Sequence, residues 1–262
     1  MSKTDKTSNN NSAAIKPATT CMIVGCKQAK AHALWQDTDN GICSNCPSHN
    51  KCAVIASKYS SYNHYMSGVP TDYLDARFSG IVKWYGEDLA TDVMTFAEDA
   101  INKPSRKVLY MHGKPGTGKT YSAAAIIRAV GKYAPEHKLS WVNVPAVVRT
   151  LSAGTYEDRC RYINQVCEAN VVVLDDLRVR NQTPAALRII DDIIRSRYDA
   201  GINTVITTNK TLKDLTQDMV TLYGDDDALS LADRIKHGYE AIHFDGASQR
   251  TVGTKKSKNK SK

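Results

Sequence analysis

The sequence predicts an α/β fold in which helices cover both faces of a parallel sheet, giving three layers. Three observations support this prediction. Short apolar runs alternate with helix-forming stretches from about residue 81 to residue 250, as parallel sheets require. A glycine-rich loop, 113–120, joins an apolar run to a helical stretch. A second apolar run, 169–176, ends in two carboxylates, which are common at the rim of parallel sheets.

The elements follow from the same alternation. A strand is expected at each short apolar run, and a helix at each longer stretch with apolar residues every three or four positions. The expected strands are 107–112, 139–144, 170–175, 203–208 and 239–244. The expected helices are 85–101, 119–131, 145–152, 156–168, 184–200, 211–218 and 226–236.

The glycine-rich loop carries the most specific pattern in the chain. It consists of Gly113, Lys114, Pro115, Gly116, Thr117, Gly118, Lys119 and Thr120. This is G-x-x-x-x-G-K-[ST], the phosphate-binding P-loop. Glycines let backbone N–H groups turn towards phosphates where a Cβ would obstruct, the lysine places a charge on the β- and γ-phosphates, and the threonine offers its hydroxyl to Mg²⁺. A chance match in a glycine-rich turn is the alternative, and the flanking strand and helix argue against it.

The two carboxylates suit the same chemistry. In P-loop enzymes the first acid after such a strand holds Mg²⁺ through water, and the next polarises the attacking water. Asp175 and Asp176 stand at those places. The sequence therefore predicts binding of ATP with Mg²⁺, and hydrolysis; the alternative is an ordinary acidic strand end.

Two further residues resemble parts of AAA+ ATPases. The apolar run 203–209 ends in Asn209, which resembles the polar residue called sensor 1 that holds the attacking water. Arg234 lies late in the expected helix 226–236, where AAA+ proteins carry an arginine finger that reaches the neighbouring subunit's γ-phosphate. The alternatives are a turn asparagine and a surface arginine favoured by the helix dipole.

From residue 68 to 250 the chain resembles the AAA+ helicase loaders of the DnaC/DnaI type and the related IstB-type helper ATPases of transposition. The matching segments are 68–73, 112–120, 173–177, 207–209, 232–235 and 246–250. The resemblance implies an AAA+ domain without a C-terminal lid, since only 53 residues follow Asn209. It also implies a slow ATPase that binds the hexameric replicative DNA helicase, assembles as a homo-oligomer with ATP and loads the helicase onto single-stranded DNA. The loop after Asp176 carries Arg178 and Arg180, which suit contact with DNA phosphates, although a solvated basic loop is an equal alternative.

The N-terminal part carries five of the seven cysteines. Two pairs of closely spaced cysteines can bring together the four soft ligands of a tetrahedral Zn²⁺. So small a segment needs a bound metal to stabilise its fold. The first ligand set is Cys26, Cys43, Cys46 and Cys52; Cys21, His32 or His49 could replace a member. Unligated thiols and an iron–sulfur cluster are the alternatives. In one branch of the loader family the N-terminal domain is zinc-bearing and docks the helicase, and Cys43 to Cys52 resembles that domain.

Composition sets the remaining expectations. The chain has ordinary hydrophobic and charged fractions, no apolar run that spans a bilayer and no secretory signal, so we expect a cytoplasmic location and no membrane partner. Five lysines in 255–262 supply more than half of the net charge of +8 and suit weak contact with nucleic acid. We expect five regions: disordered 1–20, a cysteine-rich zinc module at 21–66, a connector at 67–80, the ATPase domain at 81–250 and a basic disordered tail at 251–262.

Three functions compete at this point. The favoured one is an ATP-switched helicase loader, and the second is an IstB-type ATPase that assists a DNA transposase. A zinc-dependent DNA-binding regulator with a vestigial P-loop is the third, and the intact Lys119, Thr120, Asp175 and Asn209 argue against it.

Overall fold

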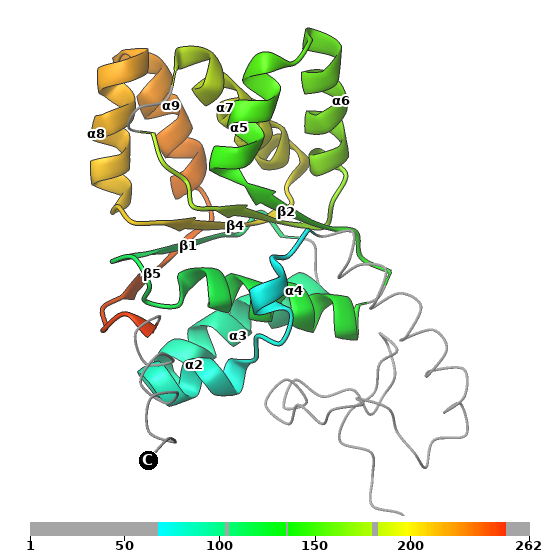
Figure 1. Ribbon diagram of the computed structural model, residues 1–262, viewed down its shortest axis with the longest axis vertical. Coiled ribbons are helices and arrows are strands. Elements are labelled where there is room, and N and C mark those ends of the chain that lie inside the picture. Colours follow the sequence, from blue (N-terminus) through cyan, green and yellow to red (C-terminus); the bar gives the residue numbers. More distant parts are fainter. Residues whose placement is uncertain (1–67, 103–104, 135, 180–182, 250–262) are drawn as a thin grey trace, which may run out of the picture.

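The computed structural model describes residues 68–249, apart from 103–104, 135 and 180–182. A five-stranded sheet lies at its centre, with helices on both sides (Figure 1). The strands are β1 (Val108–Gly113), β2 (Leu139–Asn143), β3 (Val171–Asp175), β4 (Asn203–Thr208) and β5 (Tyr239–Phe244). All five expected strands are confirmed, with bounds that differ by about a residue.

The strand order is β2-β3-β4-β1-β5, and every neighbouring pair is parallel. The register aligns the carboxyl ends of β2, β3, β4 and β1: Asn143 pairs with Asp175, Leu174 with Ile206, and His112 with Thr208. The residues that follow β1, β3 and β4 therefore meet at one edge of the sheet, where open α/β sheets place their ligands.

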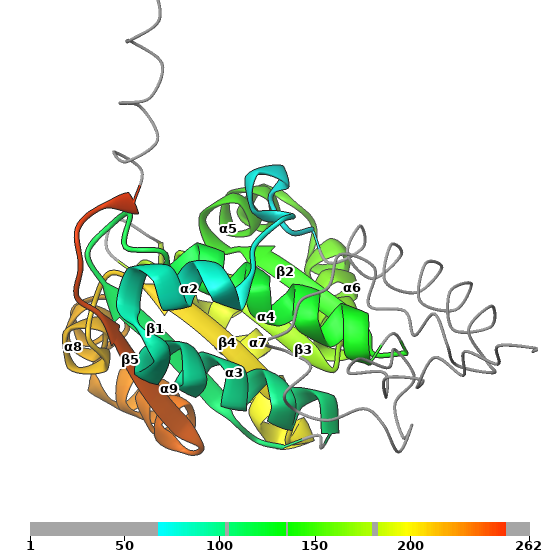
Figure 2. The same cartoon turned by 90° about the horizontal axis from the view of Figure 1, so that it is seen from below.

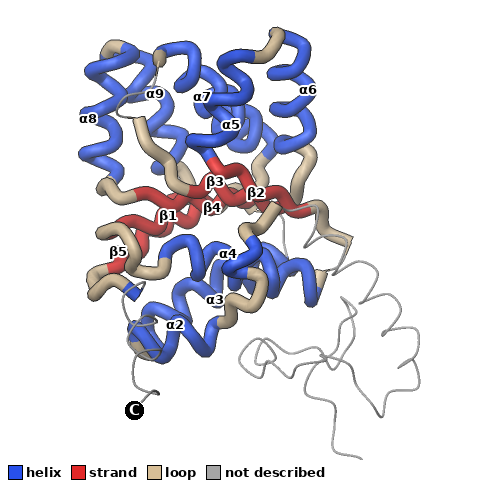
Figure 3. The backbone as a smooth tube through the Cα atoms, in the orientation of Figure 1, coloured by secondary structure: helices blue, strands red, loops and turns tan. Residues whose placement is uncertain are grey.

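Helices form the two outer layers (Figures 1 and 3). One layer holds α2 (Phe78–Tyr85), α3 (Glu87–Asn102) and α4 (Lys119–Tyr133). The other holds α5 (Val144–Ala153), α6 (Tyr156–Cys167), α7 (Pro184–Ala200), α8 (Leu212–Tyr223) and α9 (Asp225–Lys236). Seen from below, α4 lies across the sheet with α2 and α3 beside it (Figure 2). The three-layer parallel α/β architecture is thus confirmed.

Two apolar cores separate the layers. Successive strand residues point to opposite faces, so Leu109 and Met111 of β1 pack towards α4 while Val108 and Tyr110 pack towards α7. Strands β3 and β4 are buried along their whole length, because helices cover both faces of a parallel sheet.

Helix α2 and a short 3₁₀ turn, η2 (Thr71–Tyr73), were not predicted. They lie in or next to the expected connector 67–80. Val69, Ala76 and Phe78 from this stretch are buried in the core on the α4 side. The segment is therefore packed against the sheet domain, although the division of the whole chain into regions stays a prediction.

Candidate nucleotide-binding site

The glycine-rich loop lies between the end of β1 and the start of α4. Its three glycines, Gly113, Gly116 and Gly118, have φ values of 144°, 82° and 95°. Residues other than glycine rarely adopt such backbone conformations. A Cβ on Gly113 would also lie 2.3 Å from the backbone oxygen of Phe244 at the end of β5. Both local conformation and packing therefore require glycine where the loop leaves the sheet.

Lys119 is buried with 7% of its surface exposed. Its Nζ donates to the backbone oxygens of Gly113 at 2.8 Å and Lys114 at 2.7 Å. The loop is thus curled around the ammonium group, and Thr117 tightens it by donating from Oγ1 to the oxygen of Lys114 at 2.8 Å. A positive charge held against neutral carbonyls is well placed to turn to phosphate oxygens.

Tyr85, at the end of α2, ties the loop to the N-terminal helices. Its hydroxyl donates to the backbone oxygen of Thr117 at 2.5 Å, and its ring meets the edge of Phe244. Burial raises the pKa of this hydroxyl, so it stays a neutral donor at physiological pH. The contact fixes the loop from the side away from the acidic strand end.

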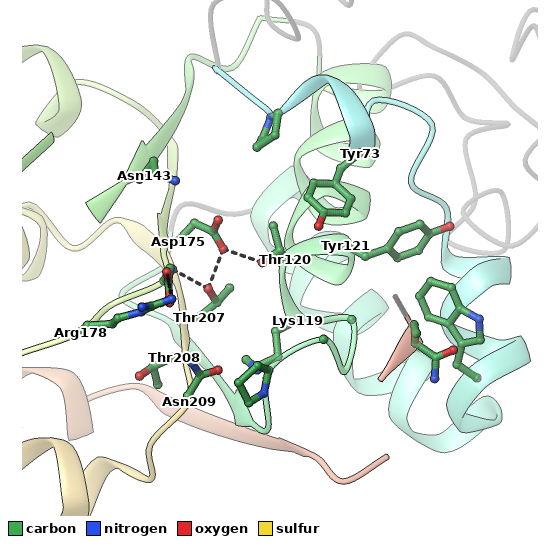
Figure 4. Close-up of a pocket in the computed structure, with 17 residues that line it drawn as sticks. Tyr73, Lys119, Thr120, Tyr121, Asn143, Asp175, Arg178, Thr207, Thr208 and Asn209 are labelled. Carbon is green, nitrogen blue, oxygen red and sulfur yellow. Dashed lines mark hydrogen bonds and ion pairs between the residues drawn. The ribbon is translucent and has the colours of Figure 1, made fainter. Parts of the chain in front are cut away.

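Asp175 ends β3 with 5% of its surface exposed. Its Oδ1 accepts from Thr120 Oγ1 at 3.0 Å and from Thr207 Oγ1 at 2.7 Å (Figure 4). Burial raises the pKa of this carboxyl, and the two hydroxyl bonds oppose that shift. The charge of Lys119, which lines the same cavity, also opposes the shift.

Thr120 and Asp175 offer the hard oxygen ligands that Mg²⁺ prefers. No group of three or more His, Cys, Asp or Glu side chains able to hold a metal occurs among the described residues. A nucleotide-linked Mg²⁺ takes one or two protein oxygens and completes its shell with phosphates and water. The residues present therefore fit this ion.

Asp176 occupies a strained turn directly after β3. Its φ of 61° makes it the one non-glycine residue with positive φ in the described part of the chain, a conformation that costs about 1–2 kcal/mol. Its N–H donates to Thr207 Oγ1 at 2.9 Å, and the N–H of Leu177 donates to the oxygen of Thr207 at 2.8 Å. Strand β4 thus holds the turn, and strain maintained in this way is typical of functional sites.

Lys119, Thr120, Asp175, Asp176 and Thr207 line one cavity of about 480 Å³, within the usual range for ligand sites. Asn209, exposed just after β4, also lines it. In Figure 4, Asp175, Thr120 and Thr207 lie together, with Arg178 on the β3 side and Tyr73 and Tyr121 across the cavity. The lining residues are Pro70, Tyr73, Trp84, Pro115, Gly116, Gly118, Lys119, Thr120, Tyr121, Asn143, Asp175, Asp176, Arg178, Thr207, Thr208, Asn209 and Gln249.

Sequence reasoning missed several of these residues. Thr207 bonds both acidic positions, and Asn143 reaches the cavity from β2. Trp84 packs against Tyr121 with ring centroids 4.6 Å apart. The only signal for Thr207 was its place two residues before Asn209, whereas Trp84 gave none because its helix was not predicted.

Arg234 does not line this cavity. It lies on α9 beside Arg106 and Val108, where β1 begins, whereas the cavity lies where β1 ends. Its Nη1 is 3.5 Å from Oδ1 of Asp191 on α7. The structure thus brings together all the other described site residues and leaves Arg234 at the opposite end of the strands.

The predicted zinc ligands Cys26, Cys43, Cys46 and Cys52, with the alternatives Cys21, His32 and His49, lie outside the described residues, as do Arg180 and the basic tail. Among the helices that the structure does describe, none has the length and apolar character to cross a membrane.

Comparison with solved structures shows the AAA+ fold. The chain matches DnaI with a TM-score of 0.56 at 24% identity, over 70% of this chain and 95% of that one. It matches the DnaC helicase loader with a TM-score of 0.52 at 20% identity, over 66% of this chain and 99% of that one. No curated protein matches the sequence.

A family model described as IstB-like ATP binding protein matches residues 91–260, which is more than half of the chain. The match includes the P-loop, both acidic positions and Asn209. The chain therefore belongs to the family of IstB-like ATP-binding proteins, with an AAA+ domain of the type seen in DnaI and DnaC.

Proposed function

We propose that this protein is an ATP-dependent helicase loader, which binds the hexameric replicative DNA helicase and places it on single-stranded DNA. One observation carries the proposal. A single cavity gathers the P-loop, the Thr120–Asp175 pair and Asn209, on a fold shared with DnaI and the DnaC helicase loader. In this role ATP acts as a switch, so slow turnover suffices.

The residues of the cavity divide the work of ATP hydrolysis. Lys119 and the loop N–H groups hold the β- and γ-phosphates, while Thr120 and Asp175 hold Mg²⁺, which neutralises phosphate charge when bound. Asp176 and Asn209 position the attacking water, and Asp176 takes its proton. The aromatic side of the cavity, formed by Tyr73 and Trp84, suits the base of the nucleotide.

Assembly supplies what one subunit lacks. Arg234 lies at the end of the strands opposite the cavity, so it could reach a transferring phosphate only in the cavity of a neighbouring copy. Such an arginine is worth about 10³- to 10⁵-fold in rate. We therefore expect an ATP-bound homo-oligomer to be the active state.

Single-stranded DNA is the proposed nucleic-acid partner. Arg178 is exposed at the mouth of the cavity, on the same loop as Arg180. Guanidinium groups bind phosphates in a bidentate manner. Binding should be tighter with ATP than with ADP, and it should weaken as salt rises because each contact releases counterions.

A pull-down from the source cells tests the loader role. The full-length protein with ATP should retain a hexameric helicase, and the Lys119→Ala variant should retain less. Lys83, exposed on α2, offers the matched control as Lys83→Ala. Retention of a transposase without a helicase would contradict the proposal.

The IstB-like family match favours a second candidate, an ATPase that assists a DNA transposase. That role requires binding to duplex DNA. Equal affinity for duplex and single strands in every nucleotide state, together with capture of a transposase, would favour it over the loader.

A further inference from the structure

The side chain of Asp176 is engaged by Arg178. Arg178 Nε donates to Oδ1 at 2.7 Å, and Arg178 Nη2 lies 2.5 Å from Oδ2. Both carboxylate oxygens therefore face one guanidinium group in a bidentate pair, the strongest geometry for such contacts. The guanidinium occupies one lone pair of each oxygen and so competes with an attacking water for this carboxylate.

The partner acid, Asp175, is held differently. It accepts only from the neutral hydroxyls of Thr120 and Thr207 among the contacts found for its carboxylate. The two adjacent acids thus have separate partners, and the arginine engages the one that we assign to the attacking water. The rigid turn at Asp176, held by Thr207, keeps its backbone in place if the arginine leaves.

Arg178 is also accessible from outside. Its side chain is 59% exposed, against 30% for Asp176, yet it lines the same cavity as Lys119 and Asn209. A phosphate that approaches from solvent can take the same bidentate position as the carboxylate, because the guanidinium fork fits both groups.

From this geometry we propose that Arg178 is a latch on Asp176, opened when a backbone phosphate of a nucleic-acid strand takes the arginine. With the latch closed, ATP binds but hydrolysis is slow. With it open, Asp176 accepts a proton from water as the water oxygen bonds the γ-phosphorus and the bond to ADP breaks. Arg178 is then a positioning residue that couples strand binding to turnover, and this inference rests on the proposed ATPase and DNA-binding function.

The first test measures steady-state ATP hydrolysis by the full-length protein without DNA. Arg178→Gln should raise kcat about two- to fivefold, the range that an exposed ion pair commonly controls, with KM for ATP unchanged. Arg178→Lys keeps the charge without the fork and should fall between the two. The matched control is Arg161→Gln, which breaks another exposed arginine–aspartate pair, with Asp158 on α6, and should leave kcat unchanged.

The second test adds a short oligothymidylate. The wild-type rate should rise towards that of Arg178→Gln, while the variant should no longer respond. NMR of the Arg178 Nε–H group reports this side-chain pair directly. With a non-hydrolysable ATP analogue alone, its signal should keep the position it has in the free protein, because the γ-phosphate is held by Lys119.

Each of these measurements either supports or overturns a step of the proposal. An unchanged kcat for Arg178→Gln at unchanged KM overturns the latch, and this measurement needs neither helicase nor DNA, so it stands apart from the loader role. Equal stimulation of variant and wild type by the oligonucleotide overturns opening by strand phosphate. A shift of the Arg178 Nε–H signal with the ATP analogue alone assigns opening to the nucleotide instead and overturns the nucleic-acid step.

Discussion

At the scale of single residues, the site depends on which partner each charge has. Lys119 is held by two carbonyls, Asp175 by two hydroxyls and Asp176 by an arginine. The hydrogen bonds of the first two are to neutral groups, and their opposite charges also interact with each other. A bound phosphate or metal ion adds a charged partner for each. These contacts suit the site to Mg²⁺ and phosphate.

Removing the lysine charge tests the assignment of the P-loop. Lys119→Ala should weaken ATP binding by about 10- to 100-fold, the worth of one or two hydrogen bonds to a charged group, and leave the fold intact. Titration with a fluorescent ATP analogue measures this, with circular dichroism as the control on folding. Hydrolysis at the wild-type rate by this variant would show that the site is elsewhere.

Asp175 should trade stability for function. Because burial raises its pKa, the ionised form is disfavoured in the folded protein. The cost of ionising the buried carboxyl lowers the free energy of unfolding. This cost is absent below the pKa that Asp175 has in the unfolded chain, and it grows as pH rises from there through the higher pKa of the folded protein. Asp175→Asn keeps an oxygen for Thr120 and Thr207, so the variant should melt at a higher temperature than wild type at pH 7, and the gain should shrink in acid.

Mg²⁺ with ATP should reverse the order of the two melting temperatures, so that wild type melts at a higher temperature than Asp175→Asn. Ligands stabilise the state that binds them, and the variant lacks the negative charge for the metal. Thermal melts with EDTA and with Mg²⁺·ATP give both results. A variant that is stabilised by Mg²⁺·ATP as strongly as wild type would contradict the metal assignment.

At the scale of elements, the pattern of residues along the chain predicted the positions of the strands, but it predicted the contacts between elements less well. The P-loop spacing and the apolar runs located β1, β3 and β4, since these are properties of consecutive residues. Helix α2 was missed because it is only eight residues long and contains Gly80, which has a weak helix propensity. A Cβ on Gly80 would lie 2.3 Å from the hydroxyl of Tyr121, so this glycine serves packing against α4 rather than local conformation.

Arg197 shows the same limit. Nothing in the residue pattern indicates that this α7 residue is buried, with 1% of its surface exposed. It donates to Ala169 at 2.8 Å, to Val166 at 3.3 Å, to the Thr204 hydroxyl at 2.9 Å and to the Asn203 oxygen. Burial lowers the pKa of this guanidinium to about 10, so it remains charged at neutral pH. One side chain thus joins α7 to the loop before β3 and to the start of β4.

Arg197→Met should destabilise the protein by about 3 kcal/mol. The change removes a desolvated charge, which is favourable, but it leaves several buried oxygens without a donor, and a lost partner in a buried network costs more. Urea unfolding measures the difference, and Arg197→Lys, with fewer donors, should lie between. Equal stability of Arg197→Met and wild type would mean that the desolvation cost of the buried guanidinium is as large as the stabilisation from its hydrogen bonds.

At the scale of the whole molecule, we expect the cysteine-rich module and the AAA+ domain to fold and bind their ligands independently of each other. Purified protein should carry about one Zn²⁺ per chain, by the usual four-ligand count. Replacing Cys43 and Cys46 by Ser should remove the metal and weaken helicase binding, while ATP binding by the AAA+ domain persists. Metal analysis measures the first result, and an iron chromophore or no metal would refute the ligand set.

The position of Arg234 leads to a prediction about assembly. Arg234→Ala should keep ATP binding and lose hydrolysis, and Asp175→Asn should lose hydrolysis through its own cavity. In a mixture, the intact cavity of the first can be completed by the intact arginine of the second. Random mixing at equal amounts places these partners in order at about a quarter of head-to-tail interfaces, so about a quarter of wild-type activity should return.

A control separates this role of Arg234 from a structural one. Arg234 and Arg195 both contact Asp191, at 3.5 and 3.3 Å, so Arg195→Ala removes a partner of the same carboxylate without touching the proposed finger. It should retain hydrolysis. Suppose instead that mixtures of Arg234→Ala and Asp175→Asn stay inactive at every ratio while each variant assembles with ATP. Arg234 would then act within its own subunit, by anchoring α9 to α7 through Asp191, and the arginine that completes the cavity would have to come from another element.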